Sequence, residues 1–96
     1  MARRRYLLTY DISDDKRRTR VFHLLQDHGD HVQFSVFLCE LNPRERVELK
    51  AQLTTAIHAR EDHVLILDMG DVDQPVEKML ESLGRPYEPP TRTIVV

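Results

Sequence analysis

The chain of 96 residues fits one small domain, and its 41% hydrophobic and 31% charged residues exclude an intrinsically disordered protein. The net charge of −2 excludes a uniformly basic nucleic-acid-binding protein. The longest apolar run, at residues 64–67, is too short to cross a bilayer, and no signal-peptide core follows the arginine-rich N-terminus, so we expect a cytoplasmic protein without a membrane partner.

The N-terminal part of the chain predicts a strand, a turn and a helix. Residues 6–11 form a short β-prone run that ends at an acid. Ser13, which two acidic residues follow, is expected to cap the next helix. Apolar residues recur at helical spacing from Val21 to His28, and Gly29 is expected to end this helix.

An alternating run then predicts the second strand. Residues 32–39 are expected to form one long strand at the centre of the sheet, because both of its faces are partly apolar. Phe34 and Phe37 fall on opposite faces, and we expect both in the core rather than on a base-stacking surface. Cys39 is the only cysteine, which excludes an internal disulfide and predicts a buried, inert thiol.

The second half of the chain predicts a helix, a strand and a short helix. The first of these helices begins at an asparagine cap, Asn42, which a proline follows, with Glu45 three residues after the cap. Residues 64–69 read as a strand bounded by Gly70. Residues 75–83 have a proline start, an apolar stripe and a glycine stop, which predict a third helix.

The C-terminal residues read as a strand after a stiff linker. Residues 85–90 are proline-rich and residues 91–96 are strongly β-prone. Such a strand is suited to pairing with the sheet edge of a second copy, although pairing within its own subunit is the alternative. The element order indicates a single α+β domain over residues 1–96, a ferredoxin-like split βαβ fold with helices on one face of an antiparallel sheet.

Asp11 is the first candidate for chemistry, because it closes an apolar strand just before a helix begins. One carboxylate is a poor magnesium site. Mg²⁺ takes one or two carboxylates together with waters and phosphate oxygens, so two copies of Asp11 that face each other across the two-fold axis of a homodimer are sufficient. The alternative is a structural role, in which Asp11 caps the turn near Ser13.

Basic residues gather near the N-terminus. Residues 1–20 hold seven of the 14 basic residues and three of the 16 acidic ones, a net charge of +4 against −6 for the remainder. Four cations begin the first helix: Lys16, Arg17, Arg18 and Arg20. Cations at a helix start suggest phosphate contacts, so we take Arg17, Arg18 and Arg20 as nucleic-acid-binding candidates. A solvated face paired with nearby acids is the alternative.

The histidines offer no metal-binding pattern. They are His23, His28, His31, His58 and His63. No two lie four residues apart and no cysteines accompany them, so we expect surface residues. The sequence also lacks a Walker loop, a nucleophile elbow and a dinucleotide fingerprint.

Residues 10–21, together with residues 32–37, closely resemble the CRISPR-associated protein two family, the small subunit of the spacer-acquisition machinery. The strand-end Tyr10-Asp11 pair, the basic helix start, the Gln-x-Ser-Val-Phe strand and the overall length occur together in the family's order. The resemblance implies a ferredoxin-like homodimer in which Asp11 of both subunits holds one Mg²⁺ per dimer. It also implies that residues 91–96 pack on the partner subunit and that the dimer bridges the CRISPR integrase subunits.

Members of the family that the chain resembles are described both as metal-dependent endonucleases and as scaffolds. Our leading hypothesis is a magnesium-dependent endonuclease of low activity on RNA or duplex DNA, with Asp11 as its catalytic and metal-binding residue. Carried over by position from the resemblance, Arg18 and Arg20 are expected to contact the nucleic acid. The sequence offers no dedicated general base beyond Asp11, but a metal lowers the pKa of its bound water and could supply hydroxide. The alternative is a non-catalytic adaptor that binds duplexes. A small-molecule-sensing domain is disfavoured, because the chain has no glycine-rich ligand loop.

Overall fold

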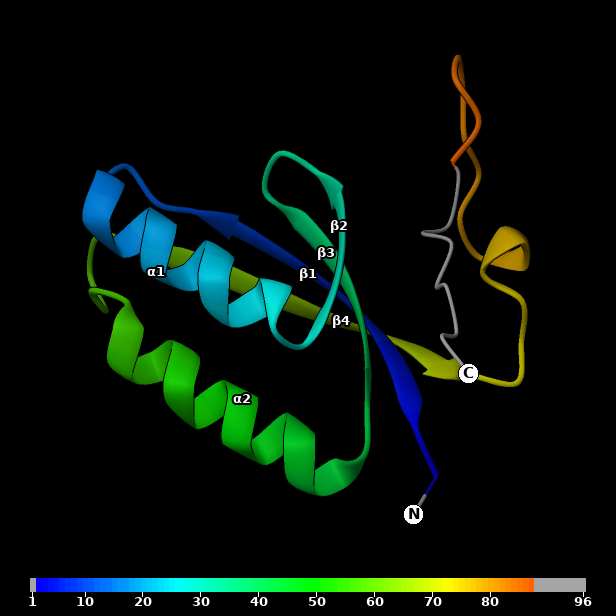
Figure 1. Cartoon of the computed structure of the whole chain (residues 1–96), viewed down its shortest axis with the longest axis horizontal. Helices are drawn as coiled ribbons and strands as arrows, with labels where there is room; N and C mark the ends of the chain where they lie inside the picture. The colour runs from blue at the N-terminus through cyan, green and yellow to red at the C-terminus, as the bar shows by residue number, and fades with distance from the viewer. Residues whose placement is uncertain (1, 88–96) are drawn as a thin grey trace, which may run out of the picture.

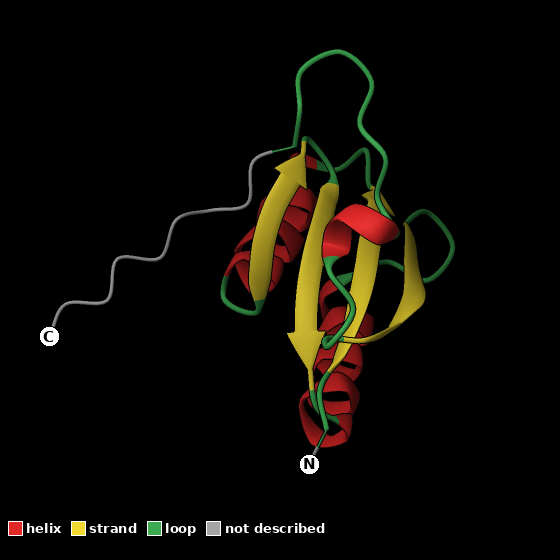
Figure 2. Ribbon diagram, turned by 90° about the vertical axis from the view of Figure 1, so that its right-hand side faces the viewer, coloured by secondary structure: helices red, strands yellow, loops and turns green. Residues whose placement is uncertain are grey.

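A computed structural model describes residues 2–87 of the chain. The elements are β1 (Arg4–Asp11), α1 (Asp15–Gln26), β2 (Gly29–Gln33), β3 (Val36–Leu41), α2 (Pro43–Ala56), β4 (His63–Asp71) and a 3₁₀ turn, η1 (Val76–Lys78). The strands form one antiparallel sheet in the order β2-β3-β1-β4. Both helices lie on one side of this sheet, and the segment after β4 lies on the other (Figures 1 and 2). This is the expected ferredoxin-like α+β fold.

The hydrophobic core lies between the sheet and the two helices. Tyr6, Leu8 and Tyr10 alternate along β1 and pack with Val21 and Leu25 of α1. The other buried members of this core are Ile12, Phe37, Cys39, Leu41, Leu49, Leu53 and Ala56. Because side chains alternate along a strand, the intervening residues of β1 face the opposite, open side of the sheet.

The single long strand expected over residues 32–39 is wrong. A two-residue turn divides the run into β2 and β3, and Gln33 pairs with Val36 across this turn. β3 is central, between β2 and β1, whereas β2 lies at the edge of the sheet. Phe37 is fully buried as expected, but Phe34 lies in the turn and is 84% exposed, so the expectation that it belongs to the core is also wrong.

The two helix starts differ in how well the sequence predicts them. The cap of α1 is Asp14, which accepts a hydrogen bond from the backbone N of Arg17 at 2.9 Å, so the expected cap at Ser13 is one residue too early. α2 begins as expected. Asn42 accepts a hydrogen bond from the backbone N of Glu45 at 2.8 Å, and Glu45 accepts one from the backbone N of Asn42 at 2.9 Å.

Gly29 begins β2 instead of ending α1, which already ends at Gln26. Its backbone approaches Cys39 of β3 so closely that a Cβ atom at this position would lie 2.4 Å from the Cys39 Sγ and from the Leu38 carbonyl oxygen. Only glycine fits this approach. Cys39 itself is fully buried and free, as the sequence predicts.

The segment from β4 onward departs from expectation in two ways. β4 extends beyond the expected residues 64–69 and contains Gly70, which has a φ of +93° and lies within the strand rather than at its boundary. The helix expected over residues 75–83 is reduced to η1. A helix this short depends on a packed apolar face, and Leu83 at the end of the expected stripe is 90% exposed.

The segment after β4 is fastened to the open side of the sheet by Arg5. The Nη1 atom of Arg5 donates a hydrogen bond to the carbonyl oxygen of Gln74 at 2.7 Å, and Arg5 is only 8% exposed. The expected C-terminal strand at residues 91–96 lies outside the described residues, so its pairing stays a prediction. Among residues 2–87, no helix is long and apolar enough to cross a membrane.

Candidate functional site

Asp11 is the last residue of β1 and is exposed on the open side of the sheet. Its neighbours on this side come from β4, which runs antiparallel to β1. The cross-strand pairs are Leu7 with Leu67, Thr9 with Leu65, and Asp11 with His63. The open side of these two strands is therefore an apolar strip that ends in one polar pair.

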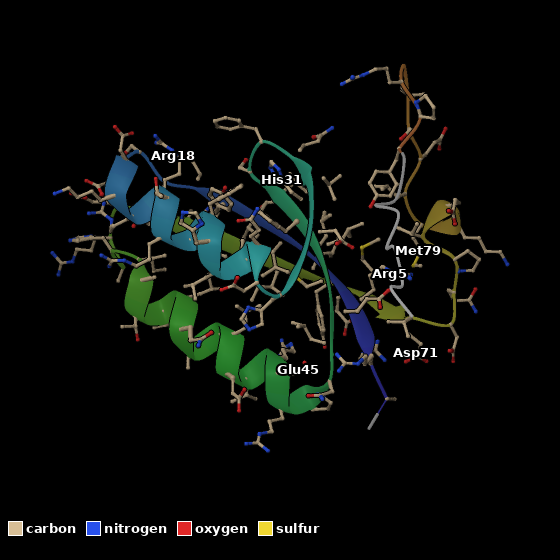
Figure 3. All side chains as sticks on the ribbon, in the orientation of Figure 1. Arg5, Arg18, His31, Glu45, Asp71 and Met79 are labelled. Carbon is tan, nitrogen blue, oxygen red and sulfur yellow. The ribbon has the colours of Figure 1, made fainter. Side chains whose placement is uncertain are left out.

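The loop that follows Asp11 is held by Arg18. Its Nη1 atom donates hydrogen bonds to the carbonyl oxygens of Ile12 at 3.1 Å and Ser13 at 3.2 Å, and its Nη2 atom forms an ion pair with Asp15. Figure 3 shows Arg18 at the N-terminal end of α1. Arg18 thus fixes the course of the chain immediately after Asp11, while its side chain remains 36% exposed.

The capping role that the sequence left open for Asp11 belongs to Asp14, three residues later. Asp14 caps α1, and among the described residues no hydrogen bond or ion pair involves the Asp11 side chain. A carboxylate that is exposed and that no side chain of residues 2–87 engages is available for a cation or a second molecule.

Arg17 makes ion pairs within the subunit. Its Nε atom lies 2.6 Å from Oδ2 of Asp62, and its Nη2 atom lies 3.0 Å from Oε2 of Glu61. The hydrogen bond to Asp62 is the main cause that raises the pKa of Arg17, and the same bond lowers the pKa of Asp62. This network joins α1 to the loop before β4, so part of the positive charge of the helix start is neutralised internally.

Arg20 is placed differently from Arg17 and Arg18. It is exposed and makes no ion pair or hydrogen bond among the residues that the structure describes. It borders a shallow groove of about 430 Å³ between the two helices. The groove is otherwise lined by Leu24, Ala51, Gln52, Thr55 and Ala56. Arg20 is therefore the candidate arginine most available to a phosphate group.

The sheet separates the candidate residues into two groups. Arg17 and Arg20 belong to the helix layer, whereas Asp11 faces the opposite side, and only Arg18 reaches the loop next to Asp11. The 2–87 segment contains no group of three or more His, Cys, Asp or Glu side chains that could hold a metal ion. The donor set at the end of β1 is thus a single carboxylate among these residues, and Mg²⁺ takes one or two carboxylates together with waters and phosphate oxygens.

His63 is the residue of this region that the sequence did not single out. It is far from Asp11 in the chain and belongs to no histidine motif, so no local signal marks it. Only the pairing of β1 with β4 brings it opposite Asp11.

These features define a small ferredoxin-like α+β protein with an exposed carboxylate at the end of its first strand. The family model described as CRISPR associated protein Cas2 matches residues 4–75. The chain therefore belongs to the Cas2 family, and the resemblance found in the sequence is confirmed.

Curated proteins and solved structures give the same assignment. The chain is 39% identical over 87 residues to a protein of Rhodospirillum rubrum named CRISPR-associated endoribonuclease Cas2 1, a match that covers 91% of this chain and 84% of that protein. It is 33% identical over 91 residues to CRISPR-associated endoribonuclease Cas2 of Geobacter sulfurreducens, with 95% of each chain covered. The crystal structure of Streptococcus pyogenes Cas2 at pH 6.5 matches with a TM-score of 0.73 and 33% identity, over 83% of this chain and 99% of that chain.

Proposed function

We propose that this protein is a homodimeric subunit of CRISPR adaptation, with a magnesium-dependent endonuclease activity of low rate on RNA or duplex DNA, and that it also bridges the integrase subunits. The observation that carries the proposal is the exposed Asp11 at the end of β1, whose side chain has no hydrogen bond or ion pair among the described residues, in a chain of the Cas2 family. The names of the relatives from R. rubrum and G. sulfurreducens, both endoribonucleases, support the nuclease activity.

The open side of the sheet supports the homodimer. Leu65 and Leu67 of β4 are 54% and 58% exposed there, next to Leu7 of β1. A second copy that covers this strip buries apolar surface and carries its own Asp11 toward the first one. In this proposal residues 91–96 pack on the partner subunit and add to the same association.

In the proposed site, Asp11 of the two subunits would hold one Mg²⁺, which neutralises phosphate charge and lowers the pKa of a coordinated water. Arg20 binds the nucleic-acid backbone without reading base sequence, because a guanidinium on a helix start reaches phosphates more readily than base edges. Arg18 keeps the loop after Asp11 in place and adds positive charge beside it.

A non-catalytic adaptor that binds duplexes is the second candidate function. It is favoured because residues 2–87 contain no cluster of metal-binding side chains. At the end of β1, these residues of each subunit offer a single carboxylate, that of Asp11, to a metal ion. In this reading the arginines bind DNA and the dimer connects integrase subunits, while Asp11 has no chemical task.

A cleavage assay on RNA and on duplex DNA separates the two functions. Asp11→Asn keeps the size of the side chain and removes the charge that Mg²⁺ requires, so Mg²⁺-dependent cleavage should fall by orders of magnitude. Dimer mass and duplex affinity should not change. Asp73→Asn, an exposed change in the loop after β4, is the matched control and should cleave like the wild type. Equal residual cleavage by wild type and Asp11→Asn would indicate a contaminating nuclease and favour the adaptor.

A further inference from the structure

His63 begins β4 directly opposite Asp11. Residues that are directly opposite in an antiparallel pair point to the same face, with Cβ atoms about 4.5–5.5 Å apart. The alternation along β4 agrees, since Val64 and Ile66 pack against the core while His63 is exposed. The imidazole therefore shares the open side of the sheet with the Asp11 carboxylate.

The position of His63 is fixed from both directions along the chain. The preceding residue, Asp62, has a fully shielded side chain that accepts hydrogen bonds from Arg17 and from the backbone N of His58 at 2.7 Å. On the other side, the pairing of β1 with β4 continues without a shift from Tyr6 to Asp11. Such anchoring holds a side chain close to its working geometry, as catalysis requires.

His63 also differs from the other four histidines, whose rings have partners. Nδ1 of His28 lies 2.8 Å from the Leu24 carbonyl oxygen, and Nδ1 of His58 accepts a hydrogen bond from the backbone N of Arg60. The ring of His23 contacts Phe22, and the ring of His31 contacts both Phe22 and Phe37. Within residues 2–87, no hydrogen bond, ion pair or ring contact involves the side chain of His63, so it is available to a substrate.

We propose that His63 is a second catalytic residue of this site and that it acts as the general acid. This inference rests on the proposed nuclease function. In the hydrolysis, the oxygen of a water forms a bond to phosphorus and the bond from phosphorus to the leaving oxygen breaks. The leaving oxygen takes its proton from the imidazolium of His63, and the proton of the attacking water passes to solvent. Asp11, which as a carboxylate only accepts hydrogen bonds, cannot supply that proton.

The test compares two substrates that differ in their need for a proton donor. One is an ordinary oligonucleotide. In the other, a sulfur replaces the bridging oxygen that acts as the leaving group. The chemical ends of the products of wild-type cleavage identify which bridging oxygen this is. A thiolate leaves without protonation, so the loss of a general acid matters little for the second substrate. The variants are His63→Ala and His63→Gln, with His23→Gln on the surface of α1 as the matched control.

Both His63 variants should cleave the ordinary substrate about 10²- to 10⁴-fold more slowly than the wild type. They should cleave the sulfur substrate at close to the wild-type rate, whereas Asp11→Asn should fail on both substrates and His23→Gln should be normal on both. An unchanged rate for the His63 variants on the ordinary substrate, or an equal loss on both substrates with an unchanged melting temperature, would overturn the assignment of His63 alone. Absence of any Asp11-dependent cleavage by the wild type would overturn the proposed function and this inference with it.

Discussion

Arg17 of α1 and Asp62 of the loop before β4 form a two-point contact, with Nε 2.6 Å from Oδ2 and Nη2 3.2 Å from Oδ1. The side chain of Asp62 is fully shielded and also accepts a hydrogen bond from the backbone N of His58. The contact joins the first helix to the residue immediately before β4 and thus to the end of the sheet that carries Asp11. A residue expected to contact nucleic acid thus has an evident structural task within the subunit.

Removing the charge of Asp62 should lower the melting temperature. It should also make stability depend less on pH in the acidic range. The Arg17 hydrogen bond lowers the pKa of Asp62 in the folded protein. The stabilisation is therefore fully present above the unfolded carboxyl pKa of about 3.9 and is lost as the pH falls through it toward the lowered folded value. Asp62→Asn should melt several degrees lower at pH 7 and should show a flatter decline between about pH 5 and pH 2.

Glu61→Gln is the matched control for Asp62, because Glu61 contacts the same arginine from a side chain that is 62% exposed. Exposed ion pairs contribute little, so this variant should melt like the wild type at pH 7. Thermal melts of the three proteins across the pH range measure the difference. An equal loss of melting temperature in both variants would show that the burial of Asp62 does not increase its contribution to stability.

Arg20 should contribute to the salt dependence of nucleic-acid binding without contributing to the fold. Arg20→Ala should reduce the slope of log K against log salt by about one unit for each lost phosphate contact in each subunit, at an unchanged melting temperature. Arg44→Ala removes another exposed charge, from α2, where Arg44 forms an ion pair with Glu48, and should leave the slope unchanged. Equal slopes for Arg20→Ala and the wild type would place the binding face elsewhere, with the arginines at positions 3–5 tested next.

Truncation of the two phenylalanines of the hairpin, Phe34 and Phe37, should affect the free energy of unfolding very differently. Phe37 is fully buried and contacts the rings of Tyr10, Phe22 and His31, so Phe37→Ala should lower the free energy of unfolding by about 3–5 kcal/mol. Phe34 is 84% exposed, so Phe34→Ala should change it by no more than about 0.5 kcal/mol. Urea unfolding measures both values, and a large loss from Phe34→Ala would contradict its place in the turn.

Cys39 should be unreactive in the folded protein. Burial raises the pKa of its thiol to about 12, and the nearby Asp30 carboxylate adds to the shift. The thiolate is the reactive form, so a thiol reagent at pH 8 should modify no cysteine in the native state and one per chain in guanidinium. Rapid native modification would show that the contact between β2 and β3 opens easily.

The sequence predicts the parts of the fold that have local chemical signals. The cap at Asn42, with Glu45 three residues later, marks the start of α2 correctly, and the β-prone run that ends at Asp11 locates β1. These signals act within a few residues, so they can be read without knowledge of the tertiary structure.

The hairpin between β2 and β3 has no such signal. No residue other than glycine has a positive φ among the described residues, so the turn at Phe34 and Ser35 is not of the kind that requires glycine or asparagine. The strands accommodate it through a register shift between His31 and Gln33. The alternation of apolar residues continues through the turn, which is why the sequence predicts one strand where there are two.

The residues of the candidate site also differ in whether local sequence signals predict them. Asp11 is found by its place at the end of a strand, but the ion pair of Arg17 with Asp62 and the position of His63 opposite Asp11 depend on contacts between distant parts of the chain. The exposure of Arg20 also follows from how α1 packs on α2. Sequence patterns locate the charged residues of α1 but do not indicate which of them form ion pairs within the fold.

Counting the bound metal ions tests whether Asp11 of two subunits holds one cation. Mn²⁺ can replace Mg²⁺ and is counted by electron paramagnetic resonance, at protein concentrations where the mass of the dimer is confirmed. We expect one Mn²⁺ for every two chains in the wild type and in Asp73→Asn, and none in Asp11→Asn of the same dimer mass. One Mn²⁺ per chain, or binding that survives in Asp11→Asn, would contradict this expectation.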